Sequence, residues 1–298
     1  MHSTKTRIIS VSRRTDIPAH YWSWFRNRVM QGHCVTVNPF NPSYRKMISL
    51  KPADVDVFVF WTRNPRRLMK DTEFFRYLKD NYHFYFLFTL NGYPKILEPG
   101  LPSVENSIGA FRELSSALPP GSVVWRYDPI IISDETGFDY HKKRFSYIAG
   151  LLSGYTGKVI VSIFDPYRKA DIKLKSAGIN YRIMEDLQDD SEFTDLMNHM
   201  KETADSYGIE ITSCCEDLAR VGIKSGGCID DGLMNDLFGP GIKGRKDRSQ
   251  RKNCRCIEST DIGAYNTCIY GCKYCYAVRD FEKAKIRFNN HDETAESL

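Results

Sequence analysis

Short hydrophobic runs alternate with longer amphipathic segments along the first 213 residues of the chain. The short runs are rich in β-branched and aromatic side chains, which is typical of buried strands. They predict strands at residues 8–12, 55–62, 84–90, 122–126, 158–163 and 208–213. The longer segments predict helices at about residues 19–31, 66–80, 104–118, 139–152 and 190–207. Strands that alternate with helices in this way indicate a parallel α/β sheet.

Polar residues followed by a proline stand at the ends of five predicted strands. The five segments are 12–18, 61–65, 89–94, 126–129 and 164–166. Proline ends a strand and stiffens the turn, so the preceding polar side chains are expected at the carboxyl rim of the sheet. Barrel enzymes have their active sites at that rim. The pattern favours a shared site, although ordinary turn chemistry explains any single instance better.

Composition fits a globular protein. The chain has 298 residues, of which 42% are hydrophobic and 13% aromatic, enough for one large barrel or two ordinary domains. Residues 1–7 are polar and the apolar stretch after them, 8–11, is too short for a signal peptide or a membrane span. We therefore expect a cytoplasmic protein with no membrane partner.

The net charge of +5 is concentrated before the last cysteines. The basic residues there are Lys243, Arg245, Lys246, Arg248, Arg251, Lys252 and Arg255. Such a run could attract nucleic acid, but a solvated loop is the commoner explanation and the one we favour.

Eight of the nine cysteines lie between Cys214 and Cys275, and in a reducing compartment such crowding favours metal ligation over disulfides. Cys268, Cys272 and Cys275 form a CxxxCxxC motif, here called the CxxxCxxC set. Three thiolates on so short a loop fit three corners of a [4Fe-4S] cube and leave the fourth iron open. A structural zinc site is the alternative, although zinc ribbons usually show two CxxC pairs.

Four further cysteines could supply a second metal site, and these we call the second cysteine set. They are Cys214, Cys228, Cys254 and Cys256. Four thiolates would suit a second [4Fe-4S] cluster or a zinc ion. Unligated buried thiols remain an alternative, because spacing in one sequence does not prove convergence.

The CxxxCxxC spacing, with Tyr274 just before the last cysteine, resembles the signature of the radical S-adenosylmethionine enzymes. The resemblance implies an open iron that binds the amino and carboxylate groups of S-adenosylmethionine. A reductant such as flavodoxin or ferredoxin would then drive cleavage to a 5′-deoxyadenosyl radical. It also implies that Tyr274 packs beside the adenine, and Tyr270 and Asn266 are further cofactor-binding candidates.

Charged residues of the strand ends are candidates for holding the methionine carboxylate and the substrate, because a guanidinium fork binds carboxylates in a fixed plane. These candidates are Arg13, Arg14, Asp16, Arg126 and Asp128. An ordinary salt bridge at the rim accounts for each of them about equally well.

The metal motif comes last in the chain, whereas radical S-adenosylmethionine enzymes usually carry it first. A short strand at 261–267 leads into the cysteine loop, and residues 277–287 predict a helix. We therefore expect an α/β fold: an incomplete (β/α) TIM-like barrel in permuted order. The expected parts are the barrel (1–213), a cysteine-rich and basic connection (214–260), the cluster-binding strand, loop and helix (261–288) and a disordered tail (289–298).

Over nearly its full length the chain resembles a bacterial and archaeal family of unknown function, DUF1848. The resemblance rests on residues 9–18, 38–42, 60–65, 125–129 and 261–268. It implies a radical-enzyme barrel without an established substrate, and it matches Cys214 better than Cys215. We expect a radical enzyme. The alternatives are a non-radical iron–sulfur or zinc protein for electron transfer or nucleic-acid binding, and a radical enzyme that acts on nucleic acid, as spore photoproduct lyases do.

Overall fold

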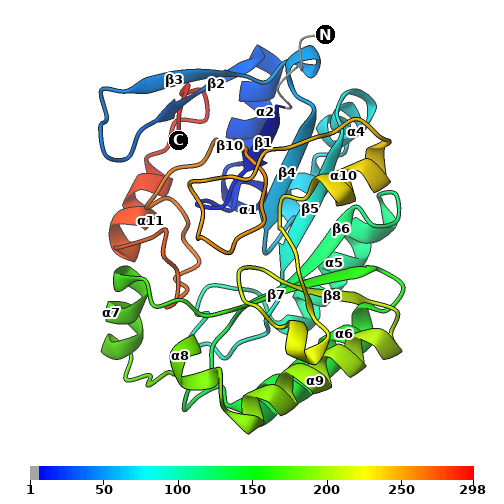
Figure 1. Ribbon diagram of the computed structural model, residues 1–298. Coiled ribbons are helices and arrows are strands. Elements are labelled where there is room, and N and C mark those ends of the chain that lie inside the picture. Colours follow the sequence, from blue (N-terminus) through cyan, green and yellow to red (C-terminus); the bar gives the residue numbers. More distant parts are fainter. Residues whose placement is uncertain (1–6) are drawn as a thin grey trace.

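The computed structural model describes residues 7–298 and contains an eight-stranded, all-parallel sheet in the order β10-β1-β4-β5-β6-β7-β8-β9 (Figure 1). Its strands are β1 (Ile8–Val11), β4 (Val57–Thr62), β5 (Phe84–Thr89), β6 (Val123–Ile130), β7 (Lys158–Ile163), β8 (Glu210–Ser213), β9 (Lys224–Ser225) and β10 (Thr260–Asp261). Because all strands run the same way, their carboxyl ends share one edge. The predicted α/β class is confirmed.

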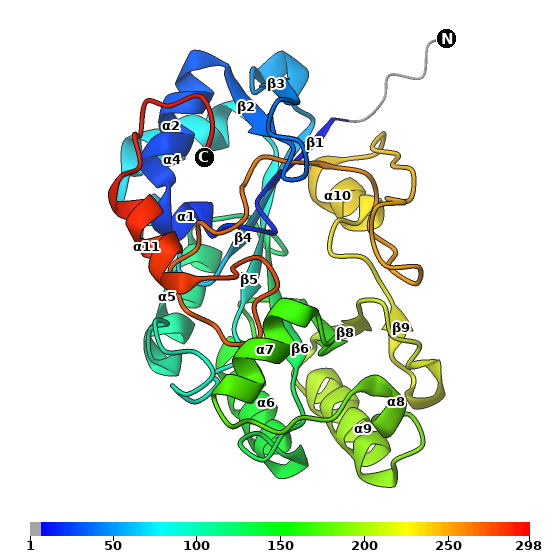
Figure 2. The ribbon, with the colours of Figure 1, turned by 90° about the vertical axis from the view of Figure 1, so that its left-hand side faces the viewer.

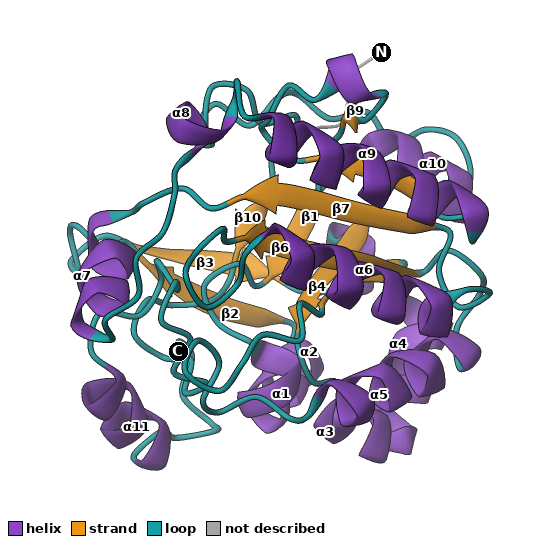
Figure 3. Cartoon of the chain, turned by 90° about the horizontal axis from the view of Figure 1, so that it is seen from below, coloured by secondary structure: helices purple, strands orange, loops and turns teal. Residues whose placement is uncertain are grey.

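The helices connect successive strands. They are α1 (Ile17–His20), α2 (Trp22–Gln31), α3 (Arg66–Lys70), α4 (Thr72–Asn81), α5 (Val104–Ser116), α6 (Phe138–Leu152), α7 (Arg168–Ser176), α8 (Met184–Leu187), α9 (Ser191–Ser206), α10 (Asp231–Phe238) and α11 (Phe281–Asn289). Short 3-10 helices occur at Pro52–Asp54 and Ala219–Val221. Seen from below, α6 lies alongside both α5 and α9 (Figure 3). Of the helices that the structure describes, none has the length and apolar character of a membrane span.

Side chains of the strands alternate between two buried faces. Phe58, Phe60 and Phe86 pack with Phe25 and other helix residues, whereas Val59 and Leu87 belong to a separate buried cluster on the opposite face. A sheet covered on both faces has strands that are hydrophobic throughout, which explains the continuous runs in the sequence. Figure 2 shows α10 on one side of the sheet and α2 and α4 on the other.

The TIM-like barrel expected from the sequence is not confirmed, because no closed barrel is seen. Across residues 7–298 the ladder ends at β9 on one side and at β10 on the other, and each of these strands has two residues. The segment 226–259 instead covers the face of the sheet that carries Val59 and Leu87, here called the inner face. The Tyr85 hydroxyl donates to the Cys228 carbonyl at 2.8 Å, and within the segment the Ile257 amide donates to the Ile229 carbonyl at 3.0 Å. The expected connecting segment is therefore part of the core.

The carboxyl-terminal residues, expected to form a disordered tail, pack against the first part of the chain. The Trp24 indole donates to the Ala295 carbonyl at 2.8 Å, and the Val35 amide donates to Glu296 at 2.8 Å. Val35 belongs to a hairpin that the sequence did not predict, β2 (His33–Val37) with β3 (Arg45–Ser49), paired antiparallel. Polar tail residues thus hydrogen-bond through their backbone, which their composition does not reveal.

Asp261 fastens the last strand to the first. Its carboxylate accepts hydrogen bonds from Ser12 Oγ at 2.6 Å, Ser10 Oγ at 3.0 Å and the Arg13 amide at 2.8 Å. At Gly263, an added Cβ would lie 2.1 Å from Ser12 Oγ, so the following turn packs too closely for any side chain. The carboxylate therefore fixes the strand from which the CxxxCxxC loop begins.

We predict that Asp261→Ala lowers the free energy of unfolding by about 3 kcal/mol, because hydrogen bonds to a charged group are lost at a buried junction. Urea denaturation measures the change. Asp292→Ala is the control, since Asp292 accepts from Thr294 at the surface and should leave the midpoint nearly unchanged. Equal midpoints in the two variants would contradict the role given to Asp261.

Candidate metal centres

The fold brings members of the second cysteine set together at the carboxyl edge. Cys214 follows β8, and Cys254 and Cys256 precede β10, yet their three sulfurs all lie within 4.8 Å of one another and are buried. Cys228, which follows β9, is buried beside them. These thiols could hold a metal ion or an iron–sulfur group.

Backbone amides point at the sulfurs of this set. Cys256 Sγ accepts from the amides of Cys228 at 3.2 Å and Ile229 at 3.5 Å, and Cys254 Sγ accepts from the Cys256 amide at 3.4 Å. Hydrogen bonding with Cys214, Cys228 and Cys254 lowers the pKa of the Cys256 thiol. Amide donors stabilise a thiolate over a thiol, and metal-bound sulfur is commonly held in this way.

Cys215 also belongs to this neighbourhood, although the sequence favoured Cys214. The two sulfurs are 3.7 Å apart, and hydrogen bonding with Cys214 lowers the pKa of Cys215 to about 3. Cys215 has a φ of +83°, a backbone conformation that residues with a side chain rarely adopt. It lines a cavity of about 650 Å³ together with Glu216 and Arg251, so this neighbour of the second cysteine set, unlike the set itself, faces open space.

The CxxxCxxC set follows β10 and lies in a different buried cluster, with Tyr270 and Tyr274. Burial, followed by the charges of Cys275 and Cys272, raises the pKa of Cys268, so the three thiols are near enough to interact. Their sulfurs are nevertheless more widely spaced than those of the second set. Among residues 7–298, Cys214, Cys254 and Cys256 form the one such compact group of three ligand atoms.

Two neighbouring segments hold the CxxxCxxC loop. The Gly100 amide donates to the Tyr270 carbonyl at 2.9 Å, and a Cβ on Gly100 would lie 2.5 Å from that oxygen. On the other side, Lys173 of α7 donates to the carbonyls of Cys275 at 2.5 Å and Val278 at 2.8 Å. The loop is therefore clamped between the segment after β5 and helix α7.

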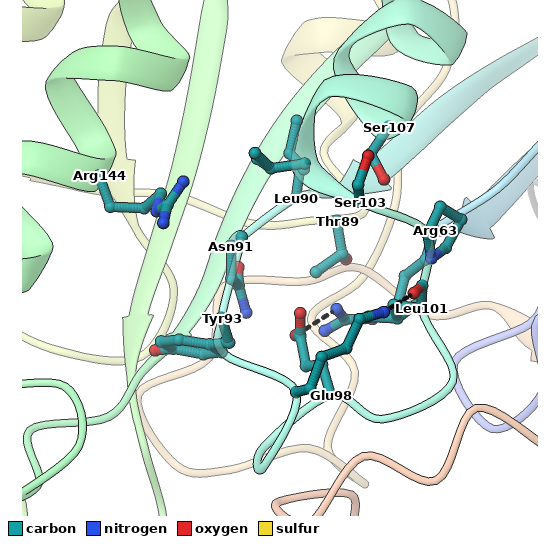
Figure 4. Close-up of a pocket in the computed structure, with 14 residues that line it drawn as sticks. Arg63, Thr89, Leu90, Asn91, Tyr93, Glu98, Leu101, Ser103, Ser107 and Arg144 are labelled. Atoms are coloured by element: carbon teal, nitrogen blue, oxygen red, sulfur yellow. Dashed lines mark hydrogen bonds and ion pairs between the residues drawn. The ribbon is translucent and has the colours of Figure 1, made fainter.

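A charged network fixes Tyr274. Arg63 donates to the Tyr274 hydroxyl at 2.6 Å and to Glu98 at 2.7 Å, and Tyr274 itself donates to Glu98. The Arg63 amide donates to Asp16 at 2.7 Å, and burial raises the pKa of Asp16 to about 6. Arg63 and Glu98 line a cavity of about 160 Å³ (Figure 4). Sequence reasoning selected Asp16 and Tyr274 but missed Arg63, whose signal is the proline-terminated segment 61–65.

Arg126 and Asp128 form an ion pair, and Asp128 also accepts from Ser162. The Arg126 guanidinium carbon lies 4.7 Å from the centre of the Trp61 ring, and that of Arg13 lies 5.3 Å from it. Burial opposes the charge of Arg126, yet Asp128 and then Cys228 raise its pKa.

Arg13 has the same kind of environment. Burial opposes its charge, yet Cys256, Asp261 and Cys228 together raise its pKa. Both arginines therefore lie beside the second cysteine set.

The remaining candidates take other positions. Arg14 stacks on Tyr265, with its guanidinium carbon 4.9 Å from the ring centre. Asn266 has a φ of +58° and accepts from the Arg279 amide at 2.7 Å, so its side chain closes the loop upon itself. The ring of Tyr270 lies 4.4 Å from that of His20, and within the described chain its buried hydroxyl has no hydrogen-bond partner.

Comparisons with known proteins agree with the full-length sequence resemblance. Residues 8–277 match the model of the family described as "Domain of unknown function (DUF1848)". The chain belongs to the DUF1848 family. No curated protein sequence matches it. A solved structure titled as that of a "putative alpha-L-fucosidase" from Bacteroides thetaiotaomicron VPI-5482 covers 80% of this chain and 85% of its own, with 13% identity and a TM-score of 0.27. Similarity at that level carries no argument about this DUF1848 protein.

We predict that replacing Cys254 and Cys256 together by serine lowers the metal content and the melting temperature, because two buried ligands are lost while the CxxxCxxC loop keeps its own thiols. Elemental analysis and thermal denaturation measure the two effects. Cys34→Ser is the matched control, since Cys34 is also buried but packs in the helix-side core. Unchanged metal content in the double variant would show that these thiols are not ligands.

Proposed function

We propose that this DUF1848 protein is a radical S-adenosylmethionine enzyme with a [4Fe-4S] cluster on Cys268, Cys272 and Cys275. The supporting observation is the placement of the CxxxCxxC loop. It leaves the end of β10 at the carboxyl edge of a parallel sheet, where Cys272 lies in one buried cluster with Tyr274 and the half-buried Cys268 and Cys275 pack against that cluster. Three ligands on a cube leave one iron for the amino and carboxylate groups of the cofactor.

Sulfur spacing supports different metals at the two cysteine sets. One tetrahedral zinc ion, with zinc–sulfur bonds of about 2.3 Å, holds its ligand sulfurs about 3.8 Å apart. The second cysteine set, with three sulfurs within 4.8 Å, is near that value. In a cube each iron takes a different thiolate, so the sulfurs stand further apart, as in the CxxxCxxC set. We therefore assign a single ion such as zinc to the second set.

A bound cluster would supply the electron that cleaves S-adenosylmethionine, received from a flavodoxin- or ferredoxin-type reductant. The chain's own residues orient and shield the site. Arg63 and Glu98 hold the Tyr274 hydroxyl, so the ring is fixed beside the loop. Asp16 is buried and influences Cys268, and its carboxylate suits the ammonium group of an amino acid. Cys272 is buried and Cys268 and Cys275 are half-buried against the same cluster, which limits the access of water that would quench a radical.

A non-radical metalloprotein is the second candidate, and the compactness of the second cysteine set favours it. A single structural ion there would fasten segment 226–259 to the sheet without any cofactor chemistry. Part of the basic segment already has structural partners: Arg251 pairs with Asp165 at 3.4 Å and Glu216 at 3.5 Å. Such a protein would bind metal but would not cleave S-adenosylmethionine.

We predict that anaerobically reconstituted protein binds about four irons and one zinc per chain. It should release 5′-deoxyadenosine when reduced with dithionite in the presence of S-adenosylmethionine. Cys272→Ala should abolish the release, because the cube loses one of three ligands. Chromatography of the nucleoside and iron analysis measure the two quantities.

Cys34→Ala is the control for removal of a buried cysteine and should keep both iron and turnover. Protein that takes up zinc but no iron under every anaerobic preparation, and forms no 5′-deoxyadenosine, would leave the non-radical candidate in place.

A further inference from the structure

Two buried arginines beside the second cysteine set keep N–H groups without a partner. Across the described residues, neither Arg13 Nη2 nor Arg126 Nε has a hydrogen-bond acceptor, although both atoms are buried. Buried donors are almost always satisfied, so two unpaired N–H groups at one place indicate an acceptor that forms only when a neighbouring group changes its charge.

Hydrogen bonds hold both guanidinium groups in place, so the unpaired N–H groups cannot find an acceptor by a simple change of side-chain conformation. Arg126 donates through Nη1 to Thr89 at 3.1 Å and through Nη2 to Asp128. Arg13 donates through Nη1 to Ser259 at 3.3 Å and lies 3.9 Å from Asp247. One edge of each guanidinium group thus donates to oxygen acceptors, and another N–H of each group has no hydrogen-bond partner.

The thiols of the second set are the neighbouring acceptors. Trp61, beneath both guanidinium groups, packs in the same buried cluster as Cys228 and Cys256. Cys228 interacts with both arginines, and Cys256 interacts with Arg13. A neutral thiol is a weak acceptor, whereas a metal-bound thiolate carries charge and accepts a strong hydrogen bond.

The charge of the proposed site also favours contact between the two arginines and the thiolates. Four thiolates around one divalent ion carry two negative charges, which a buried site tolerates only when cations and hydrogen bonds compensate them. Arg13 and Arg126 supply two positive charges, partly offset by Asp247 and Asp128. Near Cys215, in the lining of the 650 Å³ cavity, Arg251 is already paired with Glu216 at 3.5 Å. The two arginines are therefore the cations on the inner side of this site.

We infer that Arg13 and Arg126 are positioning residues of the second metal centre, donating hydrogen bonds to the metal-bound thiolates of Cys228 and Cys256. This role replaces the binding of a cofactor carboxylate that their positions at strand ends suggested. The inference rests on the second metal of the proposed function, and it does not depend on cleavage of S-adenosylmethionine.

The test is zinc affinity of the full-length protein, measured by competition with a chromophoric chelator. Arg126→Met and Arg13→Met should each weaken zinc binding about 10–100-fold, the usual effect of removing an outer partner of a metal ligand. The pH at which half of the zinc is released should rise, because protons compete better for thiolates that have lost a cation. Arg126→Lys should recover part of the loss, since it keeps the charge without the fork.

Arg26→Met is the matched control. Arg26 also pairs with a carboxylate, Asp71, at 3.3 Å and stacks on an aromatic ring, Phe74, but Phe74 belongs to the helix-side core and not to the cluster that holds Cys228 and Cys256. The zinc affinity of the Arg26→Met variant should equal that of the wild type. Loading with Co²⁺ adds a spectroscopic readout, since the thiolate-to-cobalt band should shift in the Arg126 and Arg13 variants and not in the control.

Zinc affinities of Arg13→Met and Arg126→Met within twofold of the wild type would overturn the inference while leaving the second metal in place. A wild-type protein that binds no metal at the second set would overturn both the inference and that part of the proposed function. Neither result alters the measurement of 5′-deoxyadenosine, which tests the CxxxCxxC set separately. If Arg126→Met does not fold, Arg126→Lys and Arg13→Met carry the test.

Discussion

The inner face of the parallel sheet has to be covered, and the way it is covered determines the rest of the carboxyl edge. A closed barrel covers that face with its own strands. Here β9 and β10 are too short to meet, and the segment 226–259 lies across the face instead. The same segment carries Cys228, Cys254 and Cys256, so the stretch of chain that covers the face also supplies thiols that could hold a metal. A metal at that place would join the cover to β8 through Cys214.

Much of the sheet could be predicted from the sequence because its signals are local. Runs such as Val57–Thr62 and Phe84–Thr89 are buried on both faces, and each is recognisable from its own residues. The hairpin β2 and β3 was missed because seven of its ten strand residues are polar or exposed. The two-residue strand β9 carries no pattern at all. Closure of the barrel depends on pairing between such short ends, which local sequence does not specify.

The candidate site, like the sheet, could be predicted from the sequence only where its signals are local. The sequence singled out both cysteine sets, since thiols are chemically distinctive wherever they lie, and the fold brings Cys214, Cys254 and Cys256 of the second set together. The partners of Tyr274 were missed, because Glu98 is 176 positions away and Arg63 is 211 positions away. Arg13 and Arg126 were selected as candidates for holding the methionine carboxylate and the substrate, which stays a prediction, and the sequence does not say which cysteines they face. That information comes from the sheet order, which places β1 and β6 around the same inner cluster.

The pairing of β1 with β10 also has a consequence for biosynthesis. Ser10 and Asp261, which join these strands, are 251 positions apart, and the tail that packs on α2 comes later still (Figure 1). Contacts between distant parts of a chain form only after both parts exist. On the ribosome, therefore, strands β1 to β8 emerge before the CxxxCxxC loop has been made. A cluster bound there, as proposed, would meet its ligands in their final arrangement only after β10 and the loop that follows it have been synthesised.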